Sequence, residues 1–416
     1  MKFTIQYFDR KSSAIVRIIR LLRFSPFLGG IILSFAANSS SAAPASDQTN
    51  RFGLSLLSQL IAAHSEENIV VSPFSLELAL GMVYAGCSGV SAHELSRVIG
   101  FVPQDDSQHV LFPGMGLSSH LPPNITLKIA NALWCDSSTR LRPTFVTKVK
   151  DLFQPEIQSG DLGTPETMKA INDWVAKATD GRIAGLLQQP PKPPLVLIDA
   201  VYFKGAWEKP FAAAQNFASQ FHRDKAGPCE VTMMKRSLSA PYLATDDFQA
   251  IKLPYDGGAL EMVLILPDKA IDLATLVHKL HTGSWKDTLA EFSEASGSIT
   301  LPKFKVSFRD SLIAPLTELG IKAIFQPSQD FAPMFDDARK FFVSGLIQQT
   351  YLRVDENGSE AAAATEVQME ATAMRRQRPK PFNLVLDRPF LFAIVDDDSG
   401  QLLFAGVLRD PDQAKL

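Results

Sequence analysis

The chain has 416 residues, of which 46% are hydrophobic and 20% are charged, and its formal net charge is −3. This is the composition of a globular protein with ample apolar material for a large core. Because the net charge is close to zero, nothing in it points to nucleic acid as a partner.

Residues 1–45 differ from the rest of the chain, since they hold six Lys or Arg residues and one acidic residue. An apolar run at residues 27–37 follows this basic head, and the small residues at 40–42 and 43–45 both fit a cleavage site. This layout predicts a secretory signal peptide or other targeting leader over residues 1–45, and the basic residues at three-residue spacing leave an organelle transit peptide as the alternative. The apolar run is too short to span a bilayer comfortably. We therefore expect a mature protein that is soluble and either secreted to the extracellular space or periplasmic, with no membrane partner.

Hydrophobic periodicity predicts helices and strands that are interspersed along residues 46–416. The expected helices cover residues 52–61, a segment opened by a capping box at Ser91 and Glu94, and residues 165–178, 271–280 and 311–319. The expected strands cover residues 68–71, 125–134, 195–203, 259–266, 299–308, 346–354, 390–395 and 402–408, and the last two form a hairpin. The strands lack the regular alternation with helices that a parallel sheet shows, so the fold class is α+β. No linker interrupts these elements, and residues 46–416 are expected to form a single domain.

No motif along the chain predicts an enzyme site. Phosphate-binding and dinucleotide-binding glycine loops are absent, and His278 and His281 lack the further ligands that a metal requires. The three cysteines, Cys87, Cys135 and Cys229, have no CxxC spacing. This argues against a disulfide framework or a zinc site and favours small buried side chains. The sequence therefore predicts no enzyme, no bound metal and no cofactor.

The stretch from Ser359 to Ala371 alternates between two kinds of side chain. One set is small or apolar throughout: Ser359, Ala361, Ala363, Thr365, Val367, Met369 and Ala371. The other set is mostly polar: Glu360, Ala362, Ala364, Glu366, Gln368 and Glu370. A period of two is typical of a strand with one buried face, but the same residues also fit a helix. On this stretch alone both interpretations stay open.

The residues that flank this stretch favour a segment that changes state. Asn357 and Gly358 end the strand that is expected before them. Residues 375–381 are basic and contain two prolines, as in a solvated loop that is accessible to proteases. We therefore expect the segment to be exposed in one state and paired as a strand in another.

Many blocks, in order along residues 50–411, resemble the serpin family of serine protease inhibitors. They are residues 68–75 (NIVVSPFS), 172–175, 179–181, 202–207 (YFKGAW), 253–255 (LPY), 301–304 (LPKF), 319–321, 356–365 (ENGSEAAAAT), 387–390 (DRPF) and 404–406. The resemblance implies a serpin fold with three β-sheets, about eight to nine helices and an exposed reactive-centre loop at about residues 356–386.

The same resemblance implies an inhibitor that is consumed by its reaction. A target serine protease, or a cysteine protease as a second class, attacks the loop as bait and forms an acyl-enzyme ester with it. The cut loop then inserts as a new strand in the central sheet and traps the protease covalently. The inhibitor is expected to be a monomer with a metastable fold.

Particular residues are given roles by the resemblance. The hinge of the loop comprises Glu356, Gly358, Ser359, Glu360, Ala361, Ala362, Ala363 and Ala364. Lys303 and Glu356 match a pair at the breach, the top of the sheet where the strand begins to enter, and Trp207 is expected nearby. The shutter at the centre of the sheet is matched by Ser72, Ser75, Asp199 and Gln348. Two of these depart from the family's pattern, because many serpins have asparagine in place of Asp199 and histidine in place of Gln348.

The scissile bond is placed by counting along the loop. The family's spacing from Gly358 puts it at Thr372–Ala373, which suits a protease that accepts small side chains, such as an elastase-like or subtilisin-like enzyme. Counting back from the strand that follows the loop favours other residues, namely Met374, Arg375, Arg376 or Arg378. We prefer the count from the hinge, because the inserted length has to reach the far pole of the sheet.

Two rival functions stay open. One is a non-inhibitory serpin that serves as a carrier, chaperone or storage protein, and the other is a loop that is merely a substrate cut at Arg375 or Arg376. Asn124 and Asn357 begin glycosylation sequons. A glycan on Asn357 would obstruct insertion, so we expect that residue to be unmodified.

Overall fold

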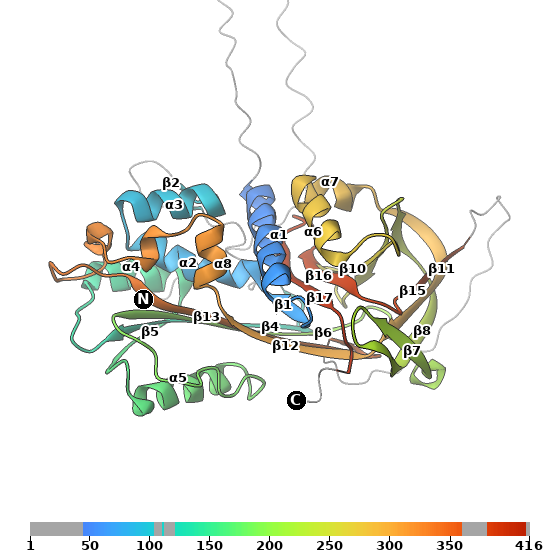
Figure 1. Cartoon of the computed structure of the whole chain (residues 1–416), viewed down its shortest axis with the longest axis horizontal. Helices are drawn as coiled ribbons and strands as arrows, with labels where there is room; N and C mark the ends of the chain where they lie inside the picture. Colours follow the sequence, from blue (N-terminus) through green and yellow to red (C-terminus); the bar gives the residue numbers. More distant parts are fainter. Residues whose placement is uncertain (1–44, 104–109, 112–120, 360–380, 413–416) are drawn as a thin grey trace, which may run out of the picture. The chain divides into compact units, whose positions relative to one another are not determined.

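The structure is a computed structural model that describes residues 45–103, 110–111, 121–359 and 381–412 (Figure 1). The chain divides into two units, Met1–Ala42 and Ala43–Leu416, and all of the described residues lie in the second. Eight α-helices occur in this described part: α1 (Ala45–Ala63), α2 (Pro73–Ala85), α3 (Gly89–Ile99), α4 (Pro143–Phe153), α5 (Pro165–Ala178), α6 (Leu273–Thr282), α7 (Trp285–Ala290) and α8 (Ile313–Glu318). None of the described helices combines the length and the apolar character that a membrane span needs.

The strands form three sheets, which confirms the predicted α+β class. They are β1 (Ile69–Val71), β2 (Val102–Pro103), β3 (Val110–Leu111), β4 (Ile125–Asp136), β5 (Glu156–Gly160), β6 (Leu195–Ala206), β7 (Phe217–Arg223), β8 (Gly227–Ala244), β9 (Phe248–Pro254), β10 (Leu260–Pro267), β11 (Ser293–Pro302), β12 (Phe304–Ser311), β13 (Val343–Val354), β14 (Gly358–Ser359), β15 (Phe382–Val385), β16 (Phe390–Asp396) and β17 (Leu402–Leu408). Nine of them form one sheet in the order β1-β17-β16-β10-β9-β8-β11-β15, with β7 paired to β8. Six form a second sheet in the order β12-β13-β6-β4-β5, with β14 paired to β6, and β2 pairs with β3.

The six-stranded sheet contains one feature that matters for function, the contact between β6 and β13. These strands run parallel and pair directly, from Val343 with Leu195 to Tyr351 with Tyr202. We call this contact the seam. Both outer neighbours, β4 and β12, run antiparallel to the seam strands. A strand placed inside the seam could therefore run antiparallel to both of its neighbours.

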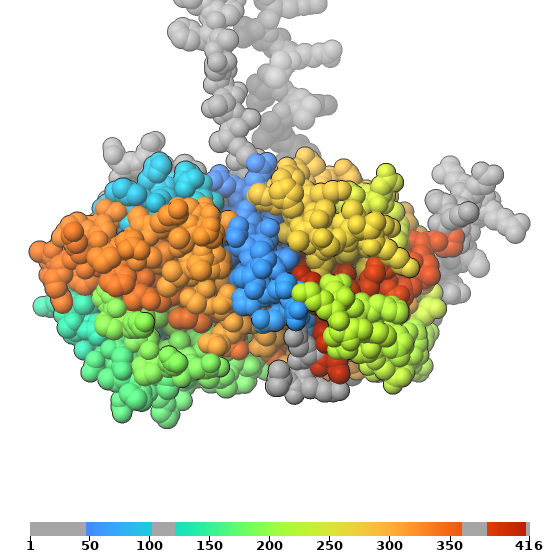
Figure 2. Space-filling model, viewed as in Figure 1, coloured from blue at the N-terminus to red at the C-terminus, as the bar shows by residue number. Residues whose placement is uncertain are grey.

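Both faces of β6 are covered, which explains why its sequence is apolar without alternation. Leu195, Leu197, Val201 and Phe203 belong to the main core, to which α2 also contributes. The residues between them, Val196, Ile198, Ala200 and Tyr202, pack in a second core with α5. Figure 1 shows α2 and α5 on opposite sides of this sheet, and in the space-filling view of Figure 2 α5 (green) lies along the edge of the molecule, below α1.

The local sequence explains the bounds of α5, which match the predicted residues 165–178. The Thr164 side chain caps its first turn by accepting a hydrogen bond from the Thr167 backbone N–H at 3.3 Å. Asp180 and Gly181 follow the helix with φ values of 51° and 75°. Because a helix cannot continue through such left-handed residues, they end it as predicted.

Two predicted elements were wrong in detail. The helix α3 begins at Gly89 with Ser88 as its N-cap, so Ser91 and Glu94 do not form a capping box. Glu94 instead accepts hydrogen bonds from the backbone N–H groups of residues 322 and 323, at 2.6 and 2.7 Å. The expected strand at residues 299–308 is two strands, β11 and β12, which separate at Lys303 and belong to different sheets.

Candidate functional site

The chain reverses direction directly after β13 and turns back along β6. The backbone N–H of Asp355 donates to the Gly358 carbonyl at 2.9 Å, and the Trp207 N–H donates to the Asn357 carbonyl at 2.9 Å. Gly358 then pairs with Ala206, and Ser359 pairs with Gly205, in antiparallel register. The predicted hinge therefore begins as a two-residue strand, β14, that already lies against β6.

Glycine is required at position 358 for two separate reasons. Its φ of 142° lies in the region that side chains rarely adopt. A Cβ atom there would also lie 2.7 Å from the Ala206 Cα and 2.8 Å from the Trp207 nitrogen. Both conditions come from the close approach of the hinge to β6.

Ser359 is fully buried beside an aromatic residue that is distant in the sequence. Its Oγ lies 2.7 Å from the Tyr255 hydroxyl, and burial raises the pKa of Tyr255. The Tyr255 ring stacks on Trp207, with ring centroids 4.8 Å apart and an angle of 12° between the planes. The Trp207 Nε1–H donates to the Asp355 carbonyl at 3.0 Å. This pair of rings forms the wall against which the hinge rests.

The predicted pair of Lys303 and Glu356 is in contact. The Lys303 Nζ lies 3.0 Å from Glu356 Oε1, and the Asn216 side-chain amide donates to the same oxygen. Burial alone would raise the pKa of Glu356, but hydrogen bonds from its own backbone, from Lys303 and from Asn216 outweigh burial and lower it. We call Trp207, Tyr255, Lys303, Glu356, Gly358 and Ser359 the hinge site.

A second cluster crosses the seam near its middle, and it contains all four residues of the predicted shutter. Asp199 on β6 lies directly opposite Gln348 on β13. The Gln348 Nε2 donates to Asp199 Oδ2 at 2.6 Å, and the Ser75 hydroxyl donates to Asp199 Oδ1 at 2.6 Å. We call Ser72, Ser75, Asp199 and Gln348 the gate. All four are buried.

The gate also joins the seam to the first turn of α2. The Ser72 backbone N–H donates to Gln348 Oε1 at 3.0 Å, and the Gln348 Nε2 donates to the Ser72 carbonyl at 3.0 Å. The Ser72 hydroxyl donates to the Leu403 carbonyl at 2.7 Å. The Asn131 amide on β4 donates to the Ser75 carbonyl at 3.1 Å. The gate therefore ties together four strands and a helix across the seam.

The electrostatics of the gate are set by burial of a carboxyl group without a positive partner. Burial raises the pKa of Asp199 to about 7, although hydrogen bonds from Ser75 and Gln348 act in the opposite direction. The effect of burial dominates because the charged form loses its hydration.

The remaining predicted site residues lie outside the described part of the chain. They are Glu360, Ala361, Ala362, Ala363 and Ala364 of the hinge, and Thr372, Ala373, Met374, Arg375 and Arg376 around the scissile bond. Within the described part, sequence reasoning missed Tyr255, Asn131 and Asn216 as partners of the site. Tyr255 belongs to one of the family blocks, but nothing in the sequence pairs it with Ser359, which lies 104 residues away.

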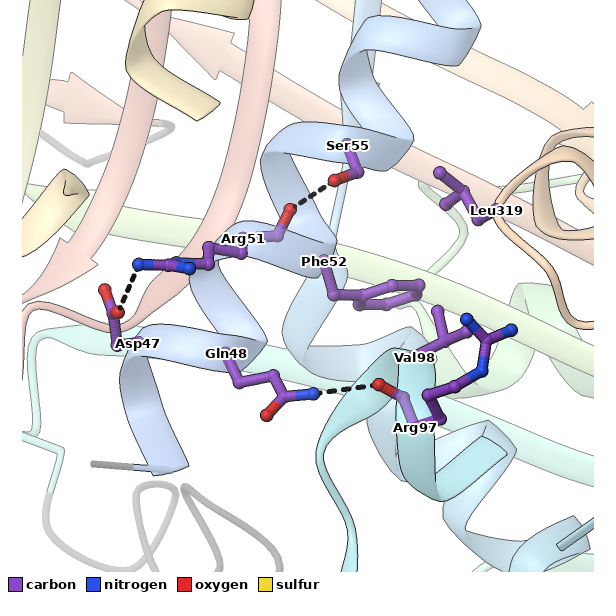
Figure 3. A pocket seen from close by; sticks show the side chains of 8 residues that line it. All are labelled: Asp47, Gln48, Arg51, Phe52, Ser55, Arg97, Val98 and Leu319. Atoms are coloured by element: carbon purple, nitrogen blue, oxygen red, sulfur yellow. Dashed lines mark hydrogen bonds and ion pairs between the residues drawn. The ribbon is translucent and has the colours of Figure 1, made fainter. Parts of the chain in front are cut away.

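Three other features of the described residues bear on the sequence predictions or on possible binding sites. No group of three or more His, Cys, Asp or Glu side chains among them could hold a metal ion. The three cysteines are free thiols; Cys135 is buried, as predicted, whereas Cys87 and Cys229 are only partly buried, so for these two the prediction of a buried side chain was wrong. A cavity of about 400 Å³ lies between α1 and α3. Figure 3 shows that residues lining it contact one another: Arg51 pairs with Asp47 at 3.3 Å, the Gln48 amide donates to the Arg97 carbonyl at 2.9 Å, and the Ser55 hydroxyl donates to the Arg51 carbonyl at 2.7 Å.

Comparisons with known proteins agree over almost the whole of the described unit. The family model described as serpin (serine protease inhibitor) matches residues 47–411. A serpin-like protein of Thermococcus kodakarensis is 33% identical over 88% of this chain and 86% of its own. The leukocyte elastase inhibitor of Sus scrofa is 30% identical over 87% of this chain and 98% of its own.

Solved structures show the same fold. The native state of tengpin, a thermophilic serpin, has a TM-score of 0.79 at 24% identity and covers 88% of this chain and 93% of its own. Human thyroxine-binding globulin with thyroxine has a TM-score of 0.77 at 23% identity, covering 88% and 98%. An elastase inhibitor and a thyroxine-binding globulin are thus both among the proteins that this chain is similar to.

Proposed function

This chain belongs to the serpin family, and we propose that it inhibits serine proteases by trapping them. In the proposed reaction the serine hydroxyl of the protease attacks the carbonyl carbon of the scissile residue. The peptide bond breaks, the new amine leaves with the proton of the hydroxyl, and an ester joins the two proteins. Insertion of the loop into the seam then has to distort the protease before water hydrolyses that ester.

The observation that carries this proposal is the seating of β14 at one end of the seam. Gly358 and Ser359 already pair with β6, and β13 ends beside them at Val354. In this register each step forward along the loop is one step back along β6. Continuation of the register would place Thr365 opposite Asp199, and Met369 opposite Leu195, where β6 begins.

The alternation of the loop sequence suits such a strand. Ser359 pairs with Gly205 and lies on the main-core side of the sheet, next to Tyr255. The small and apolar set from Ala361 to Ala371 would follow it on that side. A charged side chain in the same positions would be buried without a partner, which is costly.

The polar set of the loop would face α5 rather than open solvent. Val196, Ile198 and Ala200, which alternate on that side of β6, are all fully buried in the core that α5 completes. Glu366 would pair with Ile198 in the continued register. Because a glutamate cannot be buried there unpaired, we propose that α5 moves away from the sheet while the loop enters.

The register also favours one of the scissile bonds. Thr372 would lie three residues beyond the end of β6, so that a protease attached to it would be pressed against the end of the sheet. Arg376 would lie seven residues beyond, which leaves a tether of roughly 3.3 Å per extended residue and little force on the protease. We therefore propose Thr372–Ala373 as the scissile bond, and elastase-like or subtilisin-like enzymes as targets.

The energy for trapping would come from new backbone pairing. About a dozen ladder hydrogen bonds at ~0.5–1.5 kcal/mol each amount to on the order of 10 kcal/mol before any side chain is buried. This is comparable with the whole stability of many domains. It is enough to distort a captured enzyme.

The test is to mix the protein with an elastase-like enzyme and a trypsin-like enzyme and to look for an SDS-resistant complex. N-terminal sequencing of the released fragment should begin at Ala373. An Ala363→Arg variant, which puts a charge on the core side, should be cut without forming the complex. A Glu366→Arg variant is the control, because that position already carries a long charged side chain.

Two outcomes would reject the proposal. Cleavage after Arg375 or Arg376 with no complex would make the loop merely a substrate. Resistance of the loop to every serine protease tried would favour a carrier function, such as that of the thyroxine-binding neighbour.

We further propose that residues 1–45 are a targeting leader and that the mature protein is exported. The basic head and the short apolar run are the basis of this proposal. Mass spectrometry of protein recovered outside the cell should find an N-terminus near residue 43 or 46. Recovery of the full-length chain only from the cytosol would contradict export.

A further inference from the structure

The gate contains an acidic group at a place where a side-chain hydrogen bond joins the two seam strands in addition to their backbone pairing. Asp199 and Gln348 occupy opposite positions in the parallel ladder, and the bond between them spans the seam at 2.6 Å. A loop that inserts between β6 and β13 has to break this bond. This inference therefore rests on the proposed insertion mechanism and concerns its regulation.

No positive charge faces Asp199 from any of the elements around it. Its polar contacts are Ser75 on α2 and Gln348 on β13. Lys128 on β4 lies on the other side of the sheet, where it pairs with Asp180 at 3.5 Å. The alternation along the strands puts Lys204 of β6 and Arg353 of β13 on that same side, and β17 has no charged residue.

The other ionisable group near the gate is Glu77, two residues after Ser75 on α2. It is fully buried, and burial raises its pKa well above the usual value. Glu77 does not bridge the seam, because it belongs to α2 and not to either of the strands that have to part. It therefore serves as a natural control for the effect of a buried carboxyl group.

We propose that parting of β6 from β13, and with it the rate of loop insertion, is controlled by a proton on Asp199. With the proton bound, the neutral acid has little hydration to gain when the strands separate, so the closed seam is favoured, although the hydrogen bonds that Ser75 and Gln348 donate favour the charged form. With the proton lost, the buried carboxylate gains hydration when the strands separate, so separation becomes easier. The inhibitor would thus be slow in an acidic compartment and fast at neutral pH.

The sign of the effect follows from the two states of Asp199. In the closed seam burial raises the pKa of Asp199 to about 7, whereas a carboxyl group in water has a pKa of about 4. The stability that the proton gives to the closed seam is therefore fully present below about pH 4 and is lost as pH rises to 7. In this window opening releases a proton, so its rate should rise by up to about tenfold per pH unit and become constant above pH 7.

The experiment measures insertion without a protease, whose own pH dependence would obscure the result. The intact protein is incubated between pH 5.5 and 8.5 with a synthetic amidated peptide of the sequence from Ser359 to Ala371. In this peptide Glu360, Glu366 and Glu370 are replaced by glutamine, so that it carries no carboxyl group. Samples are returned to pH 8, and the fraction of protein that melts at the higher temperature gives the rate of uptake.

The wild-type protein should take up the peptide at least tenfold faster at pH 7.5 than at pH 5.5. Asp199→Asn, which keeps the size and the hydrogen-bonding shape, should take it up at a rate independent of pH. Glu77→Gln should keep the wild-type pH dependence. Because histidines titrate in the same range, the decisive comparison is between these variants across the whole profile.

The outcomes separate this inference from the proposed function. A wild-type rate that does not change with pH, or a pH dependence that persists in Asp199→Asn, would overturn the control by Asp199. Failure of the peptide to insert at any pH would instead overturn the insertion mechanism itself. If Asp199→Asn does not fold, carbon NMR of labelled aspartate in the wild-type protein decides, because the pH at which the uptake rate levels off should coincide with the pKa of Asp199 in the closed protein, and a mismatch would overturn the control by Asp199.

Discussion

At the scale of single residues, Gly358 is the position where the hinge is least tolerant of change. A Cβ atom there would collide with Ala206 and Trp207, and the φ of 142° is unfavourable for any side chain. Gly358→Ala should therefore displace β14 from β6 and lower the free energy of unfolding by about 1–3 kcal/mol. Urea unfolding followed by tryptophan fluorescence measures the loss.

Gly227 provides the matched control for this change. It also has a positive φ, of 70°, but a Cβ atom there would meet nothing within 4 Å. Gly227→Ala should therefore lower the free energy of unfolding by only about 1 kcal/mol, the cost of placing an alanine at a positive φ. Equal losses for the two variants would mean that the close approach of Gly358 to β6 contributes nothing.

The ion pair of the hinge site predicts a dependence on pH of its own. The folded-state pKa of Glu356 is lowered, so the stability it contributes is present above the pKa of an unfolded glutamate and is lost as pH falls through the folded value. The difference in unfolding free energy between the wild type and Glu356→Gln should therefore shrink toward zero between pH 7 and pH 3. Urea titrations at each pH measure this difference.

Asp199 has the opposite effect on the pH dependence of the unfolding free energy, because its folded-state pKa is raised. For this reason the comparison with Glu356→Gln has to be made at each pH rather than from the wild-type curve alone. A difference that grows as pH falls would show that Lys303 and Asn216 do not stabilise the carboxylate.

Residue pairs could be predicted from the sequence only where a resemblance placed both partners. The contact of Lys303 with Glu356 was predicted in this way, since neither spacing nor composition relates residues 53 positions apart. The contact of Ser359 with Tyr255 was not predicted, because it depends on how two sheets meet. The carboxyl–amide bond across the gate was likewise beyond the sequence, which showed only that both residues depart from the usual types.

At the scale of elements, α5 is the part that would have to move away from the sheet in the proposed insertion. The Asn172 side chain ties it to the following loop, by donating to the Leu187 carbonyl at 2.9 Å and accepting from the Leu187 N–H at 2.8 Å. Asn172→Ala should leave both backbone groups unpaired and lower the unfolding free energy by about 1–3 kcal/mol. It should also speed uptake of the loop peptide, because α5 leaves the sheet more readily.

Asp173→Ala is the control on the same helix. Asp173 pairs with Lys169 on the exposed side of α5, where both side chains are more than half exposed. Such a pair contributes about 0–1 kcal/mol, so neither stability nor uptake should change noticeably. Slower uptake by Asn172→Ala would contradict the idea that α5 obstructs the seam.

The helix α5, whose sequence has a clear helical period, was predicted well, whereas the helix α2, which has none, was not. The helix α5 has one apolar face and matches its predicted bounds. The helix α2 is apolar on nearly every side, so its sequence has no helical period, and it was not predicted. The continuous alternation at residues 299–308 concealed the break at Lys303, because both strands keep the same period on either side of it.

At the scale of the whole molecule, the intact chain should be less stable than the cleaved one. Cleavage at the loop would let about a dozen new ladder bonds form, worth on the order of 10 kcal/mol. This should raise the melting temperature by roughly 20 °C, since about 1 kcal/mol corresponds to 2–4 °C in a large domain. Differential scanning calorimetry before and after limited cleavage makes the measurement.

The cleaved Ala363→Arg variant completes this test. It has the same cut but an obstructed strand, so its melting temperature should stay near that of the intact protein. An unchanged melting temperature in the cleaved wild type would remove the source of energy for trapping. The sequence predicted the class of the fold and the place of the hinge, but not the seating of β14, which depends on the register between strands.

In this mechanism the distance between the hinge site and the gate limits the time during which the captured protease can still hydrolyse the ester. In the proposed mechanism insertion would start at Ser359, which already pairs with β6, and in the continued register it would reach Asp199 only at Thr365. Six more residues would therefore have to pair with the sheet before the strand reaches the gate. A protease that hydrolyses the ester before these residues have paired would be released, and the inhibitor would be left cleaved and inactive. The fraction of protease that escapes would thus depend on the rate of ester hydrolysis relative to the rate at which the strand passes Asp199. A substitution at the gate would therefore alter the number of inhibitor molecules consumed for each protease trapped.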